Sequence, residues 1–422
     1  MKAALLHHLG APCVATPRSV NNQPWNTHET LHFNPEVFVR LEPGGAVLTP
    51  PHLYASFLAL DQEFTDLLPP NGRIDPYGLP QDMIKLLLEN QVLLRVEPMD
   101  PKPRRSSTVL ENGLPSQVLL DVTSVCNCRC VACYHETDLD GYTPPLDDVV
   151  QRIRLLVSLG VSLFEVTGGE PFLRPDLARI LDEIAAHGAW YYVVTNGEFL
   201  ADVDQDLIER LRRGLGVAVS LDGTGELHDQ IRGRPGLFRR ILAGLDRLRL
   251  EGIRIYLVST LHQDNVHSTP DLIELAATYD TTIHLRQTIH TGGAVKNSIP
   301  RLDLRQSLQP YLNHPNVRNG LLGTKKSIPV ARYYGCGIRK RISLDVRGRI
   351  FPCVMDRQAG GRMVTSTTPA GLVQSLAEEA LDRLDRSPRC RACPKRLDRV
   401  NLFRGCGGFC RFSRSYQQER LP

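Results

Sequence analysis

The chain has 422 residues, of which 42% are hydrophobic and 23% are charged, and its formal net charge is +4. This length exceeds one ordinary core and predicts two or three domains. The sequence has no apolar run long enough to cross a bilayer and no hydrophobic stretch of signal-peptide length. Its net charge is too small to indicate nucleic acid as a partner, and the acidic balance of residues 34–100 disfavours contact with phosphates. We therefore expect a cytoplasmic protein that does not bind membranes.

The N-terminal part, residues 1–105, is predicted to form a small unit of its own. Its patterns follow the order strand, strand, helix, helix, strand, which favours a winged-helix-like unit. The predicted elements are strands at Val37–Leu41 and Ala46–Leu48, helices at Tyr54–Leu68 and Leu79–Asn90, and a strand at Val92–Val96. A polar, proline-rich linker follows.

Residues 112–293 alternate six short apolar runs with amphipathic helical stretches, a pattern typical of βα units around a parallel sheet. The predicted strands are Gln117–Val122, Ser162–Thr167, Trp190–Thr195, Gly216–Leu221, Ile253–Thr260 and Thr282–Arg286. The predicted helices are Leu146–Leu159, Asp176–His187, Gln205–Arg213, Leu237–Leu250 and Pro270–Tyr279. Six units predict an α/β fold with a partial (β/α)6 TIM barrel, whose chemistry should lie at the C-terminal ends of the strands.

The repeat is lost after residue 293, and residues 294–335 are predicted to be a linker. The remainder, residues 336–422, is rich in Gly, Arg and Cys and has too few apolar residues to form a core unaided. Bound metal would supply the missing stability.

Eleven cysteines in a reducing compartment indicate metal binding rather than disulfides. The first group follows the first barrel strand, in the sequence CNCRCVACY, and holds Cys126, Cys130 and Cys133 at the spacing C-x3-C-x2-C. Three thiolates can hold a 4Fe-4S cluster and leave one iron without a protein ligand. The spacing by itself equally allows a zinc site that also takes Cys128.

The second barrel strand ends in Gly168-Gly169-Glu170-Pro171. Glycines let the backbone approach a ligand, and the carboxylate can accept hydrogen bonds from an ammonium group. A bare turn with a solvated glutamate is the alternative. The third strand ends in Thr195-Asn196-Gly197, which by itself indicates only a turn.

The cysteine spacing followed by GGEP at the next strand end resembles the radical S-adenosylmethionine (SAM) superfamily. The resemblance implies that Cys126, Cys130 and Cys133 bind the cluster, that Cys128 does not, and that SAM chelates the free iron and is cleaved to a 5'-deoxyadenosyl radical. It also implies that Gly168 and Gly169 line the cofactor site and that Glu170 contacts the methionyl amine. An aromatic residue often precedes the third cysteine in this family. This chain has Ala132 there, and we predict that Tyr134 covers the adenine instead.

The fourth strand ends in SLDG, and HDQIRG follows closely. A hydroxyl group and a guanidinium together suit a carboxylate, although a helix cap at Asp222 and a surface Arg232 would explain the same residues. The combination resembles a branch of radical SAM enzymes with a C-terminal cluster domain. That resemblance implies that Ser220 and Arg232 hold the SAM carboxylate and that Asp222 supports them.

The second cysteine group lies in the tail, where C-x11-G-x4-C is followed by CxxC and CGGFC. Its thiols are Cys336, Cys353, Cys390, Cys393, Cys406 and Cys410. The tail taken alone would suit a zinc ribbon. Next to the barrel, it resembles the SPASM/twitch domains that carry auxiliary 4Fe-4S clusters. Six thiols cannot fill two four-cysteine sites. Either two auxiliary clusters each have three cysteine ligands, with the fourth iron left open or bound by a carboxylate such as Asp398, or the tail holds a single auxiliary cluster.

The N-terminal unit resembles the peptide-recognition (RRE) domains, similar to the pyrroloquinoline quinone chaperone, that precede many radical SAM peptide maturases. We therefore predict modification of a ribosomally synthesised precursor peptide by a thioether or carbon-carbon crosslink or a related oxidation, with electrons from a donor such as flavodoxin or ferredoxin. Radical SAM relatives that mature sulfatases have an Asp directly after the cysteine that matches Cys353. This chain has Val354 there, which disfavours formation of formylglycine. No acid or base residue is identified. The alternatives are a small-molecule substrate such as a tetrapyrrole or sugar, an RNA substrate, and a zinc-stabilised binding module without catalysis.

Overall fold

The computed structural model describes the barrel region almost completely and the flanking regions in part. The described residues are 30–34, 37–42, 45–49, 58–61, 73–74, 81–89, 91–95, 117–135, 141–288, 292–300, 305–311, 314–319, 331–333, 341–351 and 362–363.

The core of the fold is a ten-stranded sheet within these ranges. In spatial order its strands are β13 (Val317–Asn319), β12 (Ile283–Gln287), β11 (Ile255–Leu261), β10 (Gly216–Ser220), β9 (Trp190–Thr195), β8 (Leu163–Gly168), β7 (Gln117–Thr123), β15 (Arg341–Leu344), β16 (Arg349–Phe351) and β17 (Arg362–Met363). All neighbours from β13 to β15 pair in parallel, whereas β16 and β17 pair antiparallel. The parallel sheet of the predicted partial barrel is therefore confirmed.

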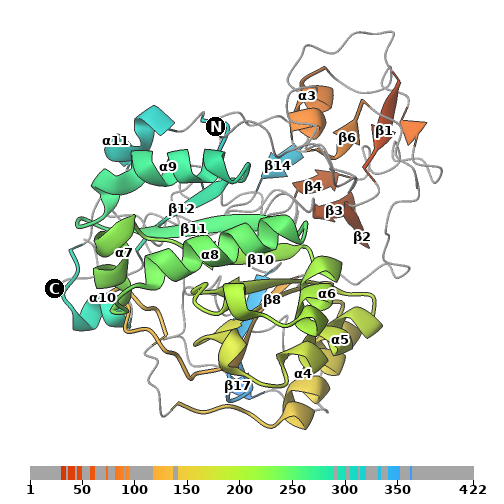
Figure 1. Cartoon of the computed structure of the whole chain (residues 1–422). Coiled ribbons are helices and arrows are strands. Elements are labelled where there is room, and N and C mark those ends of the chain that lie inside the picture. The colour runs from red at the N-terminus through yellow and green to blue at the C-terminus, as the bar shows by residue number, and fades with distance from the viewer. Residues whose placement is uncertain are drawn as a thin grey trace, which may run out of the picture.

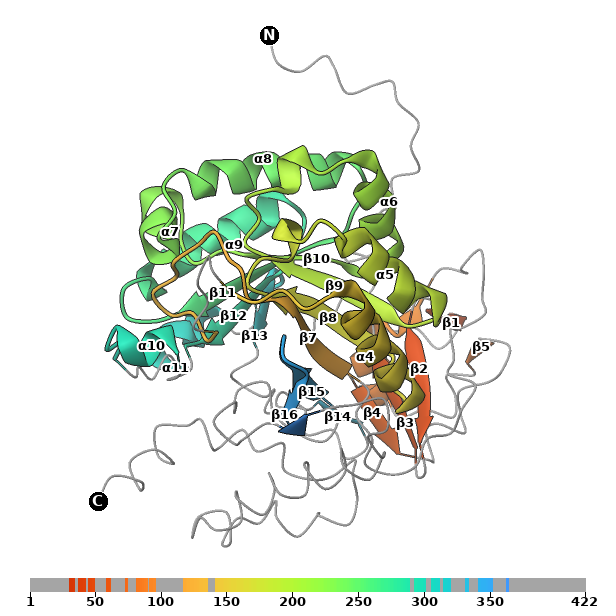
Figure 2. The same ribbon diagram turned by 90° about the horizontal axis from the view of Figure 1, so that it is seen from below.

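Helices cover the outer face of the parallel strands and form an arc around them (Figure 2). They are α4 (Leu146–Ser158), α5 (Leu177–Ala186), α6 (Gln205–Arg213), α8 (Leu237–Leu250) and α9 (Thr269–Thr278). Alternate strand residues such as Val118, Leu120 and Val122 pack with the apolar helix faces in one buried core. The other strand residues face the interior, because successive side chains of a strand point to opposite faces. The six predicted strands and five predicted helices are confirmed to within about two residues at each end.

Strands of the N-terminal unit form two small sheets, one of which also includes a strand from residues 331–333 (Figure 1). One has the order β14 (Ala331–Tyr333), β4 (Leu58–Asp61), β3 (Gly45–Thr49), β2 (Phe38–Glu42), and the other the order β5 (Arg73–Ile74), β1 (Leu31–Phe33), β6 (Leu93–Leu94). The helix α3 (Gln81–Glu89) confirms the second predicted helix. The predicted helix over residues 54–68 is wrong at Leu58–Asp61, because these residues pair antiparallel with β3 instead. The winged-helix assignment stays a prediction.

The segment predicted as a linker contributes a strand to each of the two larger sheets. β13 pairs in parallel with β12, and β14 pairs antiparallel with β4. Two short helices, α10 (Gly293–Lys296) and α11 (Arg305–Leu308), precede these strands. The predicted domain boundaries stay predictions, but residues 317–319 and 331–333 are integral to sheets rather than a bare connection. In the described ranges we find no helix long and apolar enough to cross a bilayer.

Two leucines of α8 test the packing of the helix layer. Leu248 is fully buried against the sheet, whereas the side chain of Leu250 is 86% exposed. We expect Leu248→Ala to lower the free energy of unfolding by about 2–5 kcal/mol, because the substitution removes buried methyl groups and leaves a cavity. Leu250→Ala, the matched control on the same helix, should change it by less than about 0.5 kcal/mol. Urea unfolding of both variants measures the difference, and equal losses would contradict this orientation of α8.

Candidate active site

The three-cysteine loop (residues 124–135) is named for the predicted ligands Cys126, Cys130 and Cys133 and also contains Cys128. It leaves the C-terminal end of β7 and is held at the end of β8 by backbone hydrogen bonds. Gly169 N donates to Thr123 O at 2.6 Å, and Glu170 N donates to Val125 O at 2.8 Å. A Cβ atom on Gly169 would lie 2.0 Å from Val125 O, and one on Gly168, where φ is +134°, would lie 2.2 Å from Thr123 O. The two glycines of the GGEP turn are therefore required by the close approach of the loop backbone.

The other end of the three-cysteine loop is held by α7 (Gly225–Arg232), a helix that the sequence patterns did not predict, and by α10. Arg129 N donates to Arg232 O, and Val131 N donates to Ile231 O, both at 2.9 Å. Gly293 N donates to Cys133 O at 2.7 Å. Backbone pairing thus fixes the loop on both sides.

The thiols of the loop differ in their electrostatic surroundings. A hydrogen bond from Cys128 lowers the pKa of Cys126. A hydrogen bond from Cys128 also lowers the pKa of Cys130, to about 6; the positive charge of Arg232 contributes to this shift, and burial opposes it. Hydrogen bonds to Cys126 and Cys130 raise the pKa of Cys128 well above its usual range. The lowered pKa values favour the thiolate, the form that binds metal, at Cys126 and Cys130.

The three-cysteine loop fits an iron-sulfur cluster by the chemistry of its donors. Low pKa values at two of the predicted ligands favour thiolates, and the loop is anchored next to the strand ends. Within the ranges that the structure describes, no group of three or more Cys, His, Asp or Glu side chains surrounds a common point as a metal ion would require. The fit therefore rests on donor type and spacing, and the assignment of Cys126, Cys130 and Cys133 stays a prediction.

Glu170 is completely buried and links β8 to β9. Its Oε1 accepts hydrogen bonds from Thr195 Oγ1 at 2.7 Å and from Phe172 N at 3.2 Å, and its Oε2 accepts one from Asn196 N at 2.7 Å. Burial raises the pKa of Glu170 to about 7, although these hydrogen bonds oppose the shift. The carboxylate is therefore not the solvated side chain of a bare turn.

The carboxylate of Asp222, the guanidinium of Arg232 and the thiol of Cys130 lie together beside the loop. Arg232 Nη2 lies 2.8 Å from Asp222 Oδ2, and Arg232 Nη1 lies 3.6 Å from Cys130 Sγ. The alternative of a surface Arg232 is wrong, because only 13% of its side chain is exposed. Ser220 ends β10 and is half-buried. Its predicted role with SAM, like that of Asp222 and Arg232, stays a prediction.

Asp222 is itself held in place on several sides. Its Oδ1 accepts a hydrogen bond from Thr260 N at 2.7 Å, and its own N–H donates to Nδ1 of His228 at 3.1 Å. Burial lowers the pKa of His228 to about 3, so its neutral ring can accept this bond. The Asp222–Arg232 pair is thus a fixed part of the site.

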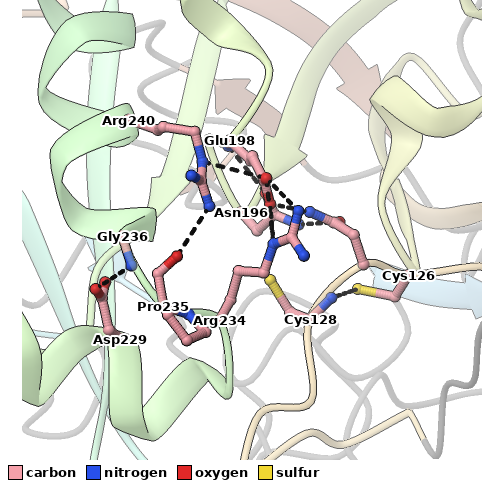
Figure 3. Close-up of polar contacts among 10 residues, drawn as sticks. Cys126, Cys128, Asn196, Glu198, Asp229, Arg234, Pro235, Gly236 and Arg240 are labelled. Carbon is pink, nitrogen blue, oxygen red and sulfur yellow. Dashed lines mark hydrogen bonds and ion pairs between the residues drawn. The ribbon is translucent and has the colours of Figure 1, made fainter.

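A second group of polar residues, which the sequence analysis missed, holds the middle of the three-cysteine loop (Figure 3). Asn196 Nδ2 donates to Asn127 Oδ1 at 2.7 Å, and Asn127 Nδ2 donates to Glu198 Oε2. Glu198 in turn accepts two hydrogen bonds from Arg234, at 2.9 and 2.6 Å, and pairs with Arg240 Nε at 3.1 Å. No sequence spacing connects position 127 with position 198. The turn signal at Thr195-Asn196-Gly197 was the only hint.

The inward face of the barrel carries buried polar and aromatic groups. Glu165 is fully buried on β8. Asp121 on β7 lies 3.3 Å from Nε2 of His135, and the His135 ring lies 4.1 Å from that of Tyr134. The predicted contact of Tyr134 with adenine is not tested by these neighbours. The six cysteines of the tail, Cys336 to Cys410, lie outside the described residues.

The buried Glu170 should leave a signature in the pH dependence of stability. Its pKa of about 7 in the folded protein exceeds the usual value of 4.5, so the folded state holds the proton more tightly than the unfolded chain. The stabilisation is complete below about pH 4.5 and is lost as the pH rises through about 7. Relative to Glu170→Gln, the wild type should lose about 3 kcal/mol of unfolding free energy over this range. Urea unfolding at several pH values measures this, and parallel pH profiles would contradict it.

Comparison with known proteins agrees with this architecture. Residues 120–276 match the sequence profile of the radical SAM superfamily. The subtilosin biosynthesis protein AlbA of Bacillus subtilis is 26% identical over 195 residues, covering 46% of this chain and 44% of AlbA. Fe-coproporphyrin III synthase of Methanosarcina barkeri is 32% identical over 162 residues, or 37% and 40% of the two chains. PqqA peptide cyclase of Bradyrhizobium diazoefficiens is 27% identical over 199 residues, or 46% and 52%.

The chain thus spans about half the length, or less, of the curated relatives it matches. Among solved structures, Streptococcus suis SuiB bound to its precursor peptide SuiA matches with a TM-score of 0.60, covering 86% of this chain and 93% of SuiB at 13% sequence identity. SuiB bound to S-adenosylmethionine matches with a TM-score of 0.59 over the same shares. This identity supports a common fold alone. Residues 120–276 therefore match the radical SAM superfamily, and the relatives that are similar to this chain include enzymes, a synthase and a cyclase.

Proposed function

We propose that the chain is a radical SAM enzyme that modifies a ribosomally synthesised precursor peptide. The proposal rests on the backbone hydrogen bonds that hold the three-cysteine loop against the GGEP turn, from Gly169 N to Thr123 O and from Glu170 N to Val125 O. Both segments lie inside the region that matches the radical SAM superfamily. Cys126, Cys130 and Cys133 would hold the 4Fe-4S cluster. When bound, the cluster and SAM together supply a 5'-deoxyadenosyl radical that abstracts hydrogen from the substrate.

The residues around the loop suit the binding of the amino-acid part of SAM. A carboxylate offers about four acceptor directions, and protein donors occupy three of those of Glu170. One direction is left for an ammonium group. Arg232 keeps a buried Nε–H without an acceptor among the described residues, which suits a carboxylate. Glu170 would therefore orient the amine, and Arg232 with Ser220 the carboxylate, while Asp222 fixes the guanidinium.

The barrel interior would hold the reacting part of the substrate away from water. The rings of Tyr192 and Tyr256 meet edge to face at 5.5 Å, and the rings of Tyr256 and His284 at 6.3 Å. Buried carboxylates at Asp121 and Glu165 lie on the inward faces of neighbouring strands. This mixed polar and aromatic lining suits an amino-acid side chain, and no single residue in it is assigned as acid or base.

A peptide substrate is supported by the relatives and by the N-terminal sheet. AlbA, the sporulation killing factor maturation protein SkfB and PqqA peptide cyclase are named for peptide products, and the SuiB structure contains a precursor peptide. In the described part of the four-stranded N-terminal sheet, β2 is an edge strand. A leader peptide could add to such an edge as a further strand. We assign the N-terminal unit this role, as an RRE-type domain.

The tail cysteines and the redox partner complete the proposal. Cys336, Cys353, Cys390, Cys393, Cys406 and Cys410 would hold one or two auxiliary 4Fe-4S clusters in a SPASM/twitch domain. A flavodoxin or ferredoxin would donate electrons, in the cytoplasm. A tetrapyrrole substrate is the second candidate, because Fe-coproporphyrin III synthase, an AdoMet-dependent heme synthase and pre-heme d1 synthase are similar to 37%, 38% and 47% of this chain.

Replacing the three predicted ligands tests the radical chemistry. The combined variant Cys126→Ala, Cys130→Ala, Cys133→Ala should abolish the formation of 5'-deoxyadenosine from SAM, because no thiolates remain to hold the cluster. It should also bind about four fewer iron atoms per chain than the reconstituted wild type and keep the iron of the tail. Cys13→Ala is the control and should retain both properties. Persistent 5'-deoxyadenosine in the triple variant would refute the proposal, and a wild-type content near four irons would remove the auxiliary clusters.

Substrate trials distinguish the two candidate functions. With SAM and a reductant, the wild type should modify a precursor peptide encoded beside its gene and give no product from coproporphyrin. The same peptide without its leader should react about tenfold more slowly or worse, because tethering through the leader raises the effective concentration of the core. Mass spectrometry of the peptide and chromatography of the porphyrin measure both outcomes. Turnover of the porphyrin but not of the peptide would favour the second candidate.

A further inference from the structure

Asn127 lies in the three-cysteine loop between Cys126 and Cys128, and both ends of its amide are engaged by the barrel. Its Oδ1 accepts a hydrogen bond from Asn196, and its Nδ2 donates one to Glu198. Asn196 is itself oriented, because its Oδ1 accepts a hydrogen bond from Glu198 N at 3.0 Å. The donor and acceptor directions of the Asn127 side chain are therefore both specified.

Glu198 is the centre of this network and is 6% exposed. Besides Asn127, its carboxylate binds Arg234 through two nitrogens and Arg240 through one (Figure 3). Burial by itself would raise the pKa of Glu198, but the hydrogen bond from Arg234 and the charges of both arginines outweigh it, so the pKa lies below its usual value. Glu198 is thus ionised. An amide in its place would have one acceptor oxygen instead of two and could not accept all of these hydrogen bonds.

The two arginines are held by the turn between α7 and α8. The carboxylate of Asp229 accepts hydrogen bonds from Gly236 N and Phe238 N, and Asp229 O accepts one from Arg234 N at 3.0 Å. Arg240 Nη2 donates to Pro235 O at 3.2 Å. The network therefore connects the middle of the loop to the end of β9 and to the start of α8.

This position matters because of where the backbone anchors lie. Backbone hydrogen bonds fix residues 123 and 125 at one end of the loop and residues 129, 131 and 133 at the other. Asn127 lies between these anchors, directly after the first predicted ligand, Cys126. Its side-chain bonds with Asn196 and Glu198 tie this stretch to the barrel.

We propose that Glu198 is a positioning residue for the cluster-binding loop: it orients Asn127 and thereby Cys126, and its negative charge offsets those of Arg234 and Arg240 next to this loop. The inference deepens the proposed function and rests on it. Two consequences follow. Loss of the hydrogen bond between Asn127 and Glu198 should change the position of Cys126 and so alter the EPR spectrum of the cluster. Loss of the charge should raise the reduction potential of the cluster, because unbalanced positive charge favours the more negative, reduced form.

A donor-acceptor swap tests the pairing. In Asn127→Asp, two carboxylates would face each other and repel. In Glu198→Gln, the single amide oxygen cannot accept from Asn127 and from both arginines, and its NH2 group would face another donor. In the double variant Asn127→Asp with Glu198→Gln, the carboxylate at 127 accepts from Asn196 and from the amide at 198, whose oxygen still accepts from Arg234. The swap keeps the total charge and restores the hydrogen bond between positions 127 and 198, while Arg234 is left with the single amide oxygen as its acceptor at position 198.

We expect each single variant to shift the EPR spectrum of the reduced cluster and to slow 5'-deoxyadenosine formation by about tenfold or more, because a hydrogen bond to a charged group is lost. Glu198→Gln should also raise the reduction potential. The double variant should return the spectrum, the potential and the rate most of the way to wild type. The matched control is Glu183→Gln, since Glu183 also pairs with an arginine, Arg154, but lies on α5 away from the loop. It should resemble wild type in all three measurements.

The outcomes separate this inference from the proposed function. A wild type that forms no SAM-binding cluster and no 5'-deoxyadenosine would refute the proposed function itself. If the wild type is active, unchanged EPR spectra and potentials in both single variants would refute the positioning role. A double variant that is no better than the single variants would refute the Asn127–Glu198 pairing as the cause. Circular dichroism of each variant verifies that the barrel is folded.

Discussion

The close backbone contact between the three-cysteine loop and the GGEP turn is the constraint on which the site depends. The loop can lie against the end of β8 only because Gly168 and Gly169 have no side chains, and two backbone hydrogen bonds then join the strand ends. This contact brings the thiols to the C-terminal ends of the parallel strands, where the charged side chains also gather. The glycines thus act first on the protein backbone, whatever they contribute to a ligand.

Around this contact the site is built from charged groups, the buried Glu170, Asp222 and Glu198 and the largely buried Arg232, that are held by fixed partners. Burial raises the pKa of Glu170 to about 7, which reduces its negative charge near neutral pH. Arg232 is paired with Asp222, and Glu198 is paired with Arg234 and Arg240. Each group approaches the loop from a different element of the barrel. Because buried charges require partners, these pairs also specify how β8, β9, β10, α7 and α8 are placed relative to the loop.

Part of the chain is similar in sequence both to relatives named for peptides and to relatives named for tetrapyrroles. The loop and strand-end residues therefore say little about the substrate, which must be selected by the barrel interior and by the parts outside it. The β13 and β14 strands are relevant here, because one stretch of chain joins the barrel sheet and then the N-terminal sheet. The N-terminal unit is thereby attached to the segment that leads into the cysteine-rich tail.

The sequence by itself determined the parallel sheet, six of its strands, five of its helices, and the two cysteine groups, because hydrophobic periodicity and short motifs are local signals. It did not determine that Leu58–Asp61 form a strand, that residues 317–319 and 331–333 join sheets, or that Asn127 and Glu198 meet. Strand pairing and charge pairing between positions far apart in the chain depend on which surfaces the fold brings together. Only the tertiary structure decided them, because no local pattern of residues encodes a partner 71 positions away.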